Sequence, residues 1–161
     1  MTTVGLYNRK YFIESGKFQR DPIRLQSLFD AIMKLSPTSV LDVGCGRGFL
    51  VRKLNDYGVY TLGVDFSDYA VKKKLSDAVF LADAKKIPFG GKSFDLVVST
   101  DFFEHIPEED IDKVYSEMKR VSNRVAARIA MLPESPKVNE YHLTIRDRGW
   151  WLNKCEGIIL L

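Results

Sequence analysis

The chain has 161 residues, about the size of one domain, and is 45% hydrophobic and 28% charged, as in an ordinary globular protein. Its net charge of +3 falls short of the basic footprint of a dedicated nucleic-acid binder, and its two distant cysteines exclude a disulfide framework and a cysteine zinc site. With no signal-like apolar segment at the N-terminus and no apolar run near the ~20 residues of a membrane span, we expect one cytoplasmic domain over residues 1–161 with no membrane partner.

The first predicted helix follows an aromatic and basic N-terminal stretch. Asp21-Pro22 is typical of a helix N-cap followed by proline at the first helical position. Apolar residues then recur at helical spacing as far as Leu35, and Ser36-Pro37 ends the pattern. We therefore expect residues 1–36 to stand apart from a core over residues 37–161.

Short apolar runs alternate with helical patterns through the core. Strands are predicted at residues 39–43, 60–64, 78–81, 94–99, 124–131 and 157–161, and helices at residues 49–57, 67–75, 107–121 and 146–156. Strands that alternate with helices indicate βαβ units, and right-handed crossovers place helices on both faces of the sheet. The expected fold class is α/β, with a doubly wound and mainly parallel sheet.

A glycine-rich loop connects the first predicted strand to the next helix, with the sequence Asp42-Val43-Gly44-Cys45-Gly46-Arg47-Gly48. Dinucleotide-binding loops need G-x-G-x-x-G, but Phe49 stands where the third glycine would be. The Asp42 carboxylate suits an ammonium group better than a pyrophosphate. S-adenosylmethionine (SAM) carries an ammonium and no phosphate, so the loop favours SAM.

Asp65 ends the second predicted strand, ~20 residues after the first glycine of the loop. A carboxylate at this distance can accept hydrogen bonds from both ribose hydroxyls of a nucleotide. Taken alone, Asp65 fits NAD as well as SAM, and the glycine spacing together with Asp42 distinguishes the two.

The motifs between residues 40 and 121 occur in the order found in class I SAM-dependent methyltransferases, which the sequence resembles. The resemblance implies a Rossmann-like sheet, a ribose contact from Asp65, and an adenine contact from Asp83 with its neighbours flanking the ring. The cofactor-binding residues that it implies are Asp42, Gly44, Cys45, Gly46, Gly48, Asp65, Phe66, Ala82, Asp83, Ala84 and Ser99.

Asp101, Glu104 and His105 are the candidate catalytic residues. They stand at positions i, i+3 and i+4, so a helix would place them on one face, beside the carboxyl end of the fourth strand. His105 could act as a general base because histidine titrates near neutral pH. The pattern also resembles those of ubiquinone-pathway O-methyltransferases and of small-RNA 3′-end 2′-O-methyltransferases. A divalent metal with His142 as a further ligand, and a purely structural role, therefore remain alternatives.

The resemblance extends to the segments on either side of the core. Helices before the first motif often cap the SAM pocket in this family, so Tyr7, Tyr11 and Phe12 are candidates for a lid within residues 1–36. The family's sheet ends in an antiparallel hairpin, for which residues 157–161 supply only one strand. An unpaired edge strand invites pairing, so a homodimer through this edge is expected. Trp150-Trp151 could line a substrate cleft or pack in the interior.

These patterns together predict an enzyme that moves a methyl group from SAM to an oxygen or nitrogen atom of a small-molecule acceptor and leaves S-adenosylhomocysteine. One alternative is a non-catalytic SAM-binding subunit that needs a partner to complete its sheet. Another is a metal-dependent RNA 2′-O-methyltransferase, which the modest net charge disfavours.

Overall fold

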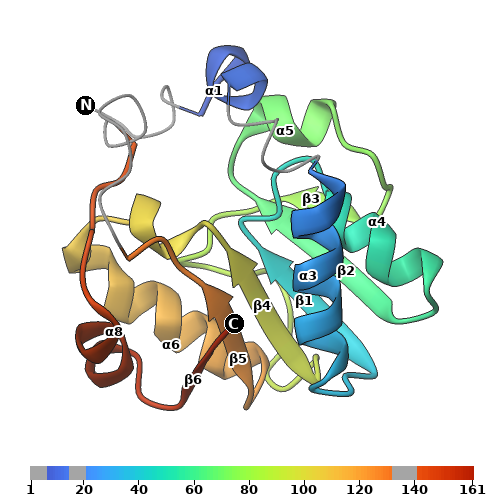
Figure 1. Ribbon diagram of the computed structural model, residues 1–161. Helices are drawn as coiled ribbons and strands as arrows, with labels where there is room; N and C mark the ends of the chain where they lie inside the picture. Colours follow the sequence, from blue (N-terminus) through green and yellow to red (C-terminus); the bar gives the residue numbers. More distant parts are fainter. Residues whose placement is uncertain (1–6, 15–20, 132–140) are drawn as a thin grey trace.

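The computed structural model describes residues 7–14, 21–131 and 141–161, which form a six-stranded sheet flanked by helices (Figure 1). The strand order is β3-β2-β1-β4-β5-β6, and each neighbouring pair is parallel. The strands are β1 (Ser39–Val43), β2 (Tyr60–Asp65), β3 (Val79–Leu81), β4 (Leu96–Thr100), β5 (Val125–Arg128) and β6 (Ile158–Leu160). The doubly wound α/β prediction is confirmed, and the order reverses direction between β1 and β4, where such sheets bind ligands.

The five predicted helices are present, several of them shorter than expected. They are α3 (Pro22–Met33), α4 (Phe49–Asp56), α5 (Asp68–Lys72), α6 (Ile111–Val121) and α8 (Arg148–Lys154). The described residues also form helix α1 (Arg9–Glu14) and the 3₁₀ turns η2 (Phe103–His105) and η3 (Glu108–Asp110), which the sequence did not predict as separate elements. The segment predicted as a helix from residue 107 therefore begins with a 3₁₀ turn. The predicted N-cap of α3 is confirmed, because the Asp21 carboxylate accepts hydrogen bonds from the backbone N–H groups of Ile23 and Arg24.

Helices cover both faces of the sheet because alternate strand residues point in opposite directions. On one face, α3 and α4 pack against Val40, Leu96, Val98 and Ala126. On the other, α6 and α8 pack against Leu41, Val43, Val97, Val125 and Ala127. The central strands are thus buried on both sides, as expected for a parallel sheet, and their sequences are nearly continuous apolar runs.

The connection from β3 to β4 contains no helix over residues 82–95, and side chains of α6 hold it in place. Glu117 accepts a hydrogen bond from the backbone N–H of Ile87, while Arg120 donates to the carbonyls of Ile87 and Phe89. Glu117 and Arg120 also pair with each other. The connection matters for the site because it begins at residues 82–84, which are expected to contact the adenine.

The two edges of the sheet are β3 and β6 in the described part of the chain. Pairing of β6 with a second copy of the chain stays a prediction. Among the described residues, no helix has the length and apolar character required to cross a membrane.

Trp151 of α8 is fully buried, with its ring 5.8 Å from that of Phe103, so it belongs to the core. Truncation of a fully buried tryptophan leaves a large cavity, and Trp151→Ala is expected to lower the free energy of unfolding by roughly 3–5 kcal/mol. Trp150→Ala is the matched control. Trp150 is only half-buried, so its truncation should lower the free energy of unfolding by only about 1–2 kcal/mol. Urea denaturation of both variants measures the difference, and equal losses would contradict the core assignment.

Candidate functional site

The glycine loop lies between β1 and α4 and requires glycine for space as well as for backbone conformation. Gly44 and Gly48 have φ angles of 76° and 82°, in the left-handed region that favours glycine. A Cβ atom on Gly44 would lie 2.3 Å from the ring of Phe102, and one on Gly48 would lie 2.5 Å from a methyl of Val79. The loop is therefore packed closely against Phe102, two residues after β4, and against β3.

The Asp65 carboxylate at the end of β2 holds this loop. One oxygen accepts a 2.8 Å hydrogen bond from the backbone N–H of Gly46, and the other accepts a 2.8 Å bond from the N–H of Ser67. Asp65 is buried, and burial raises the pKa of its carboxyl, while the two backbone hydrogen bonds lower it by a smaller amount. An oriented carboxylate here fits the ribose contact that the motif implies, since each oxygen has further lone pairs.

Asp42 is a second carboxylate on the same face of the sheet, and its surroundings leave it incompletely satisfied. Its side chain is 2% exposed, and Oδ1 has no hydrogen-bond partner among the described residues. Burial, and then the nearby charge of Asp65, raise the pKa of Asp42 to about 7. A buried polar atom without a partner is costly, so this position fits a ligand that carries a donor, such as an ammonium group.

Ser99 on β4 also has a buried hydroxyl with no partner among the described residues. Asp42 lies opposite Val98 in the β1–β4 register, so Ser99, one residue later, points toward the other face of the sheet. The structure thus places Ser99 at the correct end of β4 but does not bring its side chain together with Asp42.

The remaining predicted cofactor residues follow the ends of β1, β2 and β3. Ala82 donates its backbone N–H to the Asp65 carbonyl, and Asp83 is exposed at the end of β3, where its carboxylate accepts from the N–H of Lys85. Ala84 is partly buried against the core. The Cys45 thiol packs against Gly63, and burial raises its pKa, so it remains a thiol and acts as a packing group.

The three candidate catalytic residues do not share one helix face, because no α-helix spans residues 101–105. Asp101 has a φ of 51° and precedes the 3₁₀ turn, which contains Glu104 and His105. Its carboxylate forms an ion pair with Arg24 of α3. Glu104 is fully buried, and its Oε1 accepts a 3.1 Å hydrogen bond from the N–H of Ala130. Of the three, His105 is the one that fits a role in proton transfer.

His105 has a defined hydrogen-bonding environment. Its Nδ1 lies 2.9 Å from the carbonyl oxygen of Tyr141, and its Nε2 lies 3.5 Å from the hydroxyl of Tyr11. Burial lowers the pKa of His105 to about 4, although the bond to Tyr141 opposes this shift. The ring is therefore neutral at physiological pH.

His142 lies against His105, with 4.8 Å between ring centroids, as the metal alternative requires. Ligand atoms of Glu104, His105 and His142 lie within 4.8 Å of one another. Glu104 accepts from Ala130 through one of its two oxygens, and His105 contacts a carbonyl through one of its two ring nitrogens. Each residue has a second ligand atom, so metal binding here stays an alternative to the role of a base.

The predicted lid residues lie over the site. Tyr7 packs edge-on against Phe66 and His105, with ring centroids 5.2 Å and 5.7 Å away. Its carbonyl accepts a 2.7 Å hydrogen bond from the Ser67 hydroxyl, and Phe12 stacks on Tyr69 of α5. The lid thus joins the end of β2 to the turn after β4.

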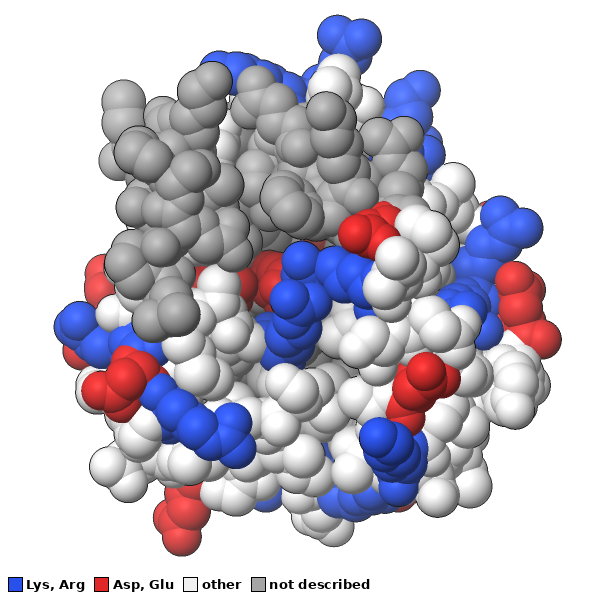
Figure 2. All heavy atoms as spheres, in the orientation of Figure 1, with Lys and Arg blue, Asp and Glu red and all other residues white. Residues whose placement is uncertain are grey.

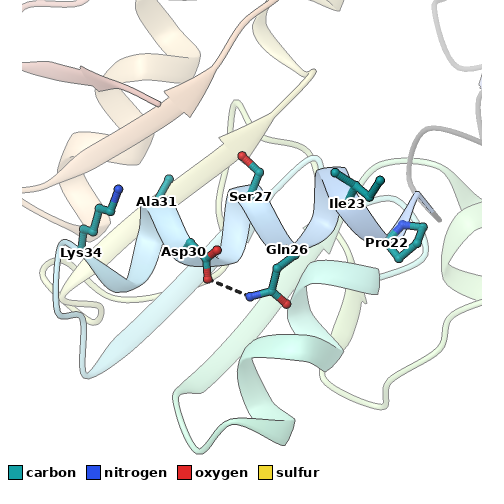
Figure 3. Close-up of a pocket in the computed structure, with 7 residues that line it drawn as sticks. All are labelled: Pro22, Ile23, Gln26, Ser27, Asp30, Ala31 and Lys34. Atoms are coloured by element: carbon teal, nitrogen blue, oxygen red, sulfur yellow. Dashed lines mark hydrogen bonds between the residues drawn. The ribbon is translucent and has the colours of Figure 1, made fainter.

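The outer face of α3 carries a groove separate from this site. It is lined by Pro22, Ile23, Gln26, Ser27, Asp30, Ala31 and Lys34 (Figure 3). None of the predicted cofactor or catalytic residues lines it. On the visible surface, basic and acidic side chains are interspersed and do not form one continuous basic patch (Figure 2).

Residues 41–124 match a protein-family model described as a methyltransferase domain, which covers the glycine loop, Asp65 and the turn after β4. The chain belongs to the class I SAM-dependent methyltransferases. Among solved structures, it is similar to the PH0226 protein of Pyrococcus horikoshii OT3, with a TM-score of 0.63 and 26% identity, over 71% of this chain and 61% of that one.

Curated methyltransferases also match over part of their length. The chain is 31% identical over 97 residues to the ubiquinone biosynthesis O-methyltransferase of Nitrosomonas europaea, covering 55% of this chain and 41% of the relative. It is 30% identical over 113 residues to norajmaline N-methyltransferase of Rauvolfia serpentina, covering 63% and 38%. The chain therefore spans about two fifths of the length of these relatives.

Sequence reasoning missed Arg24, Tyr141 and Thr144, which lie at or near this methyltransferase site. Arg24 pairs with Asp101 across 77 positions of the sequence, and Tyr141 contacts His105 across 36. No local pattern marks such contacts. The one available signal was that Tyr141 and Thr144 lie within two residues of His142, which is already a candidate metal ligand on sequence grounds.

Asp42 is expected to lower the stability of the cofactor-free protein. A carboxyl with a pKa of about 7 in the folded chain and ~3.9 in the unfolded chain holds its proton more tightly when folded. Stability is therefore lost as pH rises from ~4 to ~7. Asp42→Asn is expected to be more stable than wild type at pH ~8, by roughly 2–4 kcal/mol, with the difference vanishing near pH ~4.

Thermal denaturation across this pH range checks the prediction, with Asp56→Asn on the exposed surface as the control, which should change stability by less than about 0.5 kcal/mol. The same Asp42→Asn variant should bind SAM at least ~10-fold more weakly, because it lacks the charge that pairs with an ammonium. If Asp42→Asn were less stable than wild type at pH ~8 and bound SAM normally, neither the raised pKa of Asp42 nor its pairing with the ammonium would hold.

Proposed function

We propose that this chain transfers a methyl group from SAM to an oxygen or nitrogen atom of a small-molecule acceptor and releases S-adenosylhomocysteine. The observation that carries the proposal is the buried Oδ1 of Asp42, which has no hydrogen-bond partner among the described residues and lies beside the glycine loop, where the strand order reverses. The two relatives described above are named for oxygen and nitrogen methylation, which supports this range of acceptor atoms.

Each part of the cofactor has a group of suitable chemistry. The Asp42 carboxylate would pair with the ammonium, and Asp65 would accept hydrogen bonds from the ribose hydroxyls. Asp83, exposed at the end of β3, would accept one from the adenine amino group. The glycine loop allows close approach of the ligand because it has no side chains at positions 44, 46 and 48. When bound, SAM supplies an electrophilic methyl group on its sulfonium.

His105 would act on the acceptor side. A neutral ring whose Nδ1 donates to the Tyr141 carbonyl has an unprotonated Nε2, which can take the proton of an acceptor hydroxyl or amine. Tyr11, whose hydroxyl lies 3.5 Å from that nitrogen, would orient the acceptor. Most of the remaining catalysis would come from alignment of the acceptor atom with the methyl and from exclusion of water under the lid.

Calorimetric titration with SAM and with S-adenosylhomocysteine tests the cofactor assignment. Asp65→Asn is expected to weaken binding by about 10–100-fold, because a carboxylate that accepts from two hydroxyls is lost. Since Asp65 also holds the loop, Asp83→Ala provides a second variant with an exposed side chain and should weaken binding by several-fold. Asp56→Asn on α4 is the control and should bind normally. Absence of binding by folded wild-type protein would refute the proposal.

His105→Asn tests the base on any phenol, catechol or amine that the wild type methylates. It is expected to lower kcat by about 10²-fold, the low end of general-base effects because a base with a pKa of about 4 is weak, and to leave SAM affinity unchanged. With a pKa of about 4, His105 remains unprotonated as pH falls from ~9 to ~5, and its contribution is lost as pH falls through ~4. If the wild-type rate instead declined near pH ~6.5, and this decline were absent in His105→Asn, the lowered pKa of His105 would be wrong.

A further inference from the structure

The segment Tyr141–Thr144 lies across the turn that carries His105, and four hydrogen bonds join the two. The backbone N–H groups of Leu143 and Thr144 both donate to the carbonyl of Glu104, at 2.7 Å and 3.0 Å. The Thr144 hydroxyl donates to the Ile106 carbonyl at 2.8 Å. The fourth contact joins Nδ1 of His105 to the Tyr141 carbonyl. We name residues 141–144 the strap.

Thr144 anchors the strap from inside the protein. Its side chain is 2% exposed, whereas Leu143 beside it is 45% exposed. The hydroxyl therefore reaches the Ile106 carbonyl away from bulk water, where a hydrogen bond is hard to replace. Together, the bonds to Glu104 and Ile106 bracket His105 on both sides and fix the position of the Tyr141 carbonyl relative to the ring.

The contact with Tyr141 determines which ring nitrogen carries hydrogen. A backbone carbonyl can only accept, so Nδ1 must be the protonated nitrogen, and Nε2, which faces the Tyr11 hydroxyl, must be the one that carries a lone pair. In water, neutral imidazole side chains favour the opposite tautomer, with hydrogen on Nε2. The tautomer that the structure requires is therefore one that the protein must impose.

We propose that the strap is a positioning element that imposes the Nδ1–H tautomer on His105, with Thr144 as its anchor. In this role Thr144 touches neither acceptor nor cofactor and acts through the ring that it orients. The kinetic part of this inference rests on the proposed function of His105 as a base, whereas the tautomer itself is a property of the cofactor-free protein.

Nitrogen NMR of the imidazole rings tests the proposal directly, because it distinguishes protonated from unprotonated ring nitrogens. The chain has only two histidines, so His142→Gln assigns the signals of His105. The wild type is expected to show Nδ1–H. Thr144→Val, which keeps the shape but loses the hydroxyl, and Leu143→Pro, which removes one bond to Glu104, should each populate the Nε2–H tautomer. Thr144→Ser should restore the wild-type spectrum.

Thr61→Val is the matched control. Thr61 is also a fully buried threonine whose hydroxyl donates to a backbone carbonyl, that of Val59, but it lies at the opposite end of the sheet from the site. It should cost comparable stability without any change in the His105 spectrum. An Nε2–H wild type, an unchanged tautomer in both strap variants, or an equal change in Thr61→Val would overturn the proposal.

Kinetics separates this inference from the proposed function. If both hold, Thr144→Val lowers kcat by roughly tenfold, which is part of the ~10²-fold expected from the base, and leaves the KM for SAM unchanged. A tautomer that shifts in Thr144→Val while His105→Asn retains full turnover would uphold the strap and refute the base. A tautomer that is unchanged while His105→Asn is inactive would do the reverse.

Discussion

The site depends on two carboxylates, Asp42 and Asp65, buried on the same face of the sheet at the ends of neighbouring strands. Burial of two like charges close together is unfavourable, and the two carboxylates receive different numbers of hydrogen bonds. Asp65 receives two backbone N–H groups, one of them from the glycine loop, whereas one oxygen of Asp42 receives none among the described residues. The loop thus takes its shape from one acid and leaves the other available for a cationic ligand group.

This asymmetry explains why the glycines matter beyond ligand approach. The N–H of Gly46 can reach Asp65 only if the loop turns through left-handed backbone angles, and the packing of Gly44 against Phe102 then brings the residues after β4 against the loop. A substitution at Gly44 would displace Phe102, which immediately precedes the turn that carries His105. The Phe102 ring therefore packs between the glycine loop and the turn that carries His105.

The fold and the cofactor half of the site could be predicted from the sequence because their signals are local. Apolar strands, the glycine spacing and the acid that ends β2 each lie within a few residues. The proposed acceptor half could not, because the spacing of Asp101, Glu104 and His105 brings them to one face only in a helix. Asp101 instead adopts a left-handed conformation and pairs with Arg24. The orientation of His105 likewise depends on Tyr141, and only the folded chain brings these residues together.

The same division follows the limits of the family match. The methyltransferase match covers residues 41–124, which include Asp42, Asp65 and His105. The lid and strap residues that contact His105 or brace its turn all lie outside that match, namely Tyr7, Tyr11, Tyr141, His142 and Thr144. Every enzyme that uses SAM must bind the same cofactor, whereas each acceptor needs a binding surface of its own shape around the base. Acceptor choice in this chain should therefore follow changes in the lid and the strap, while SAM affinity follows the loop.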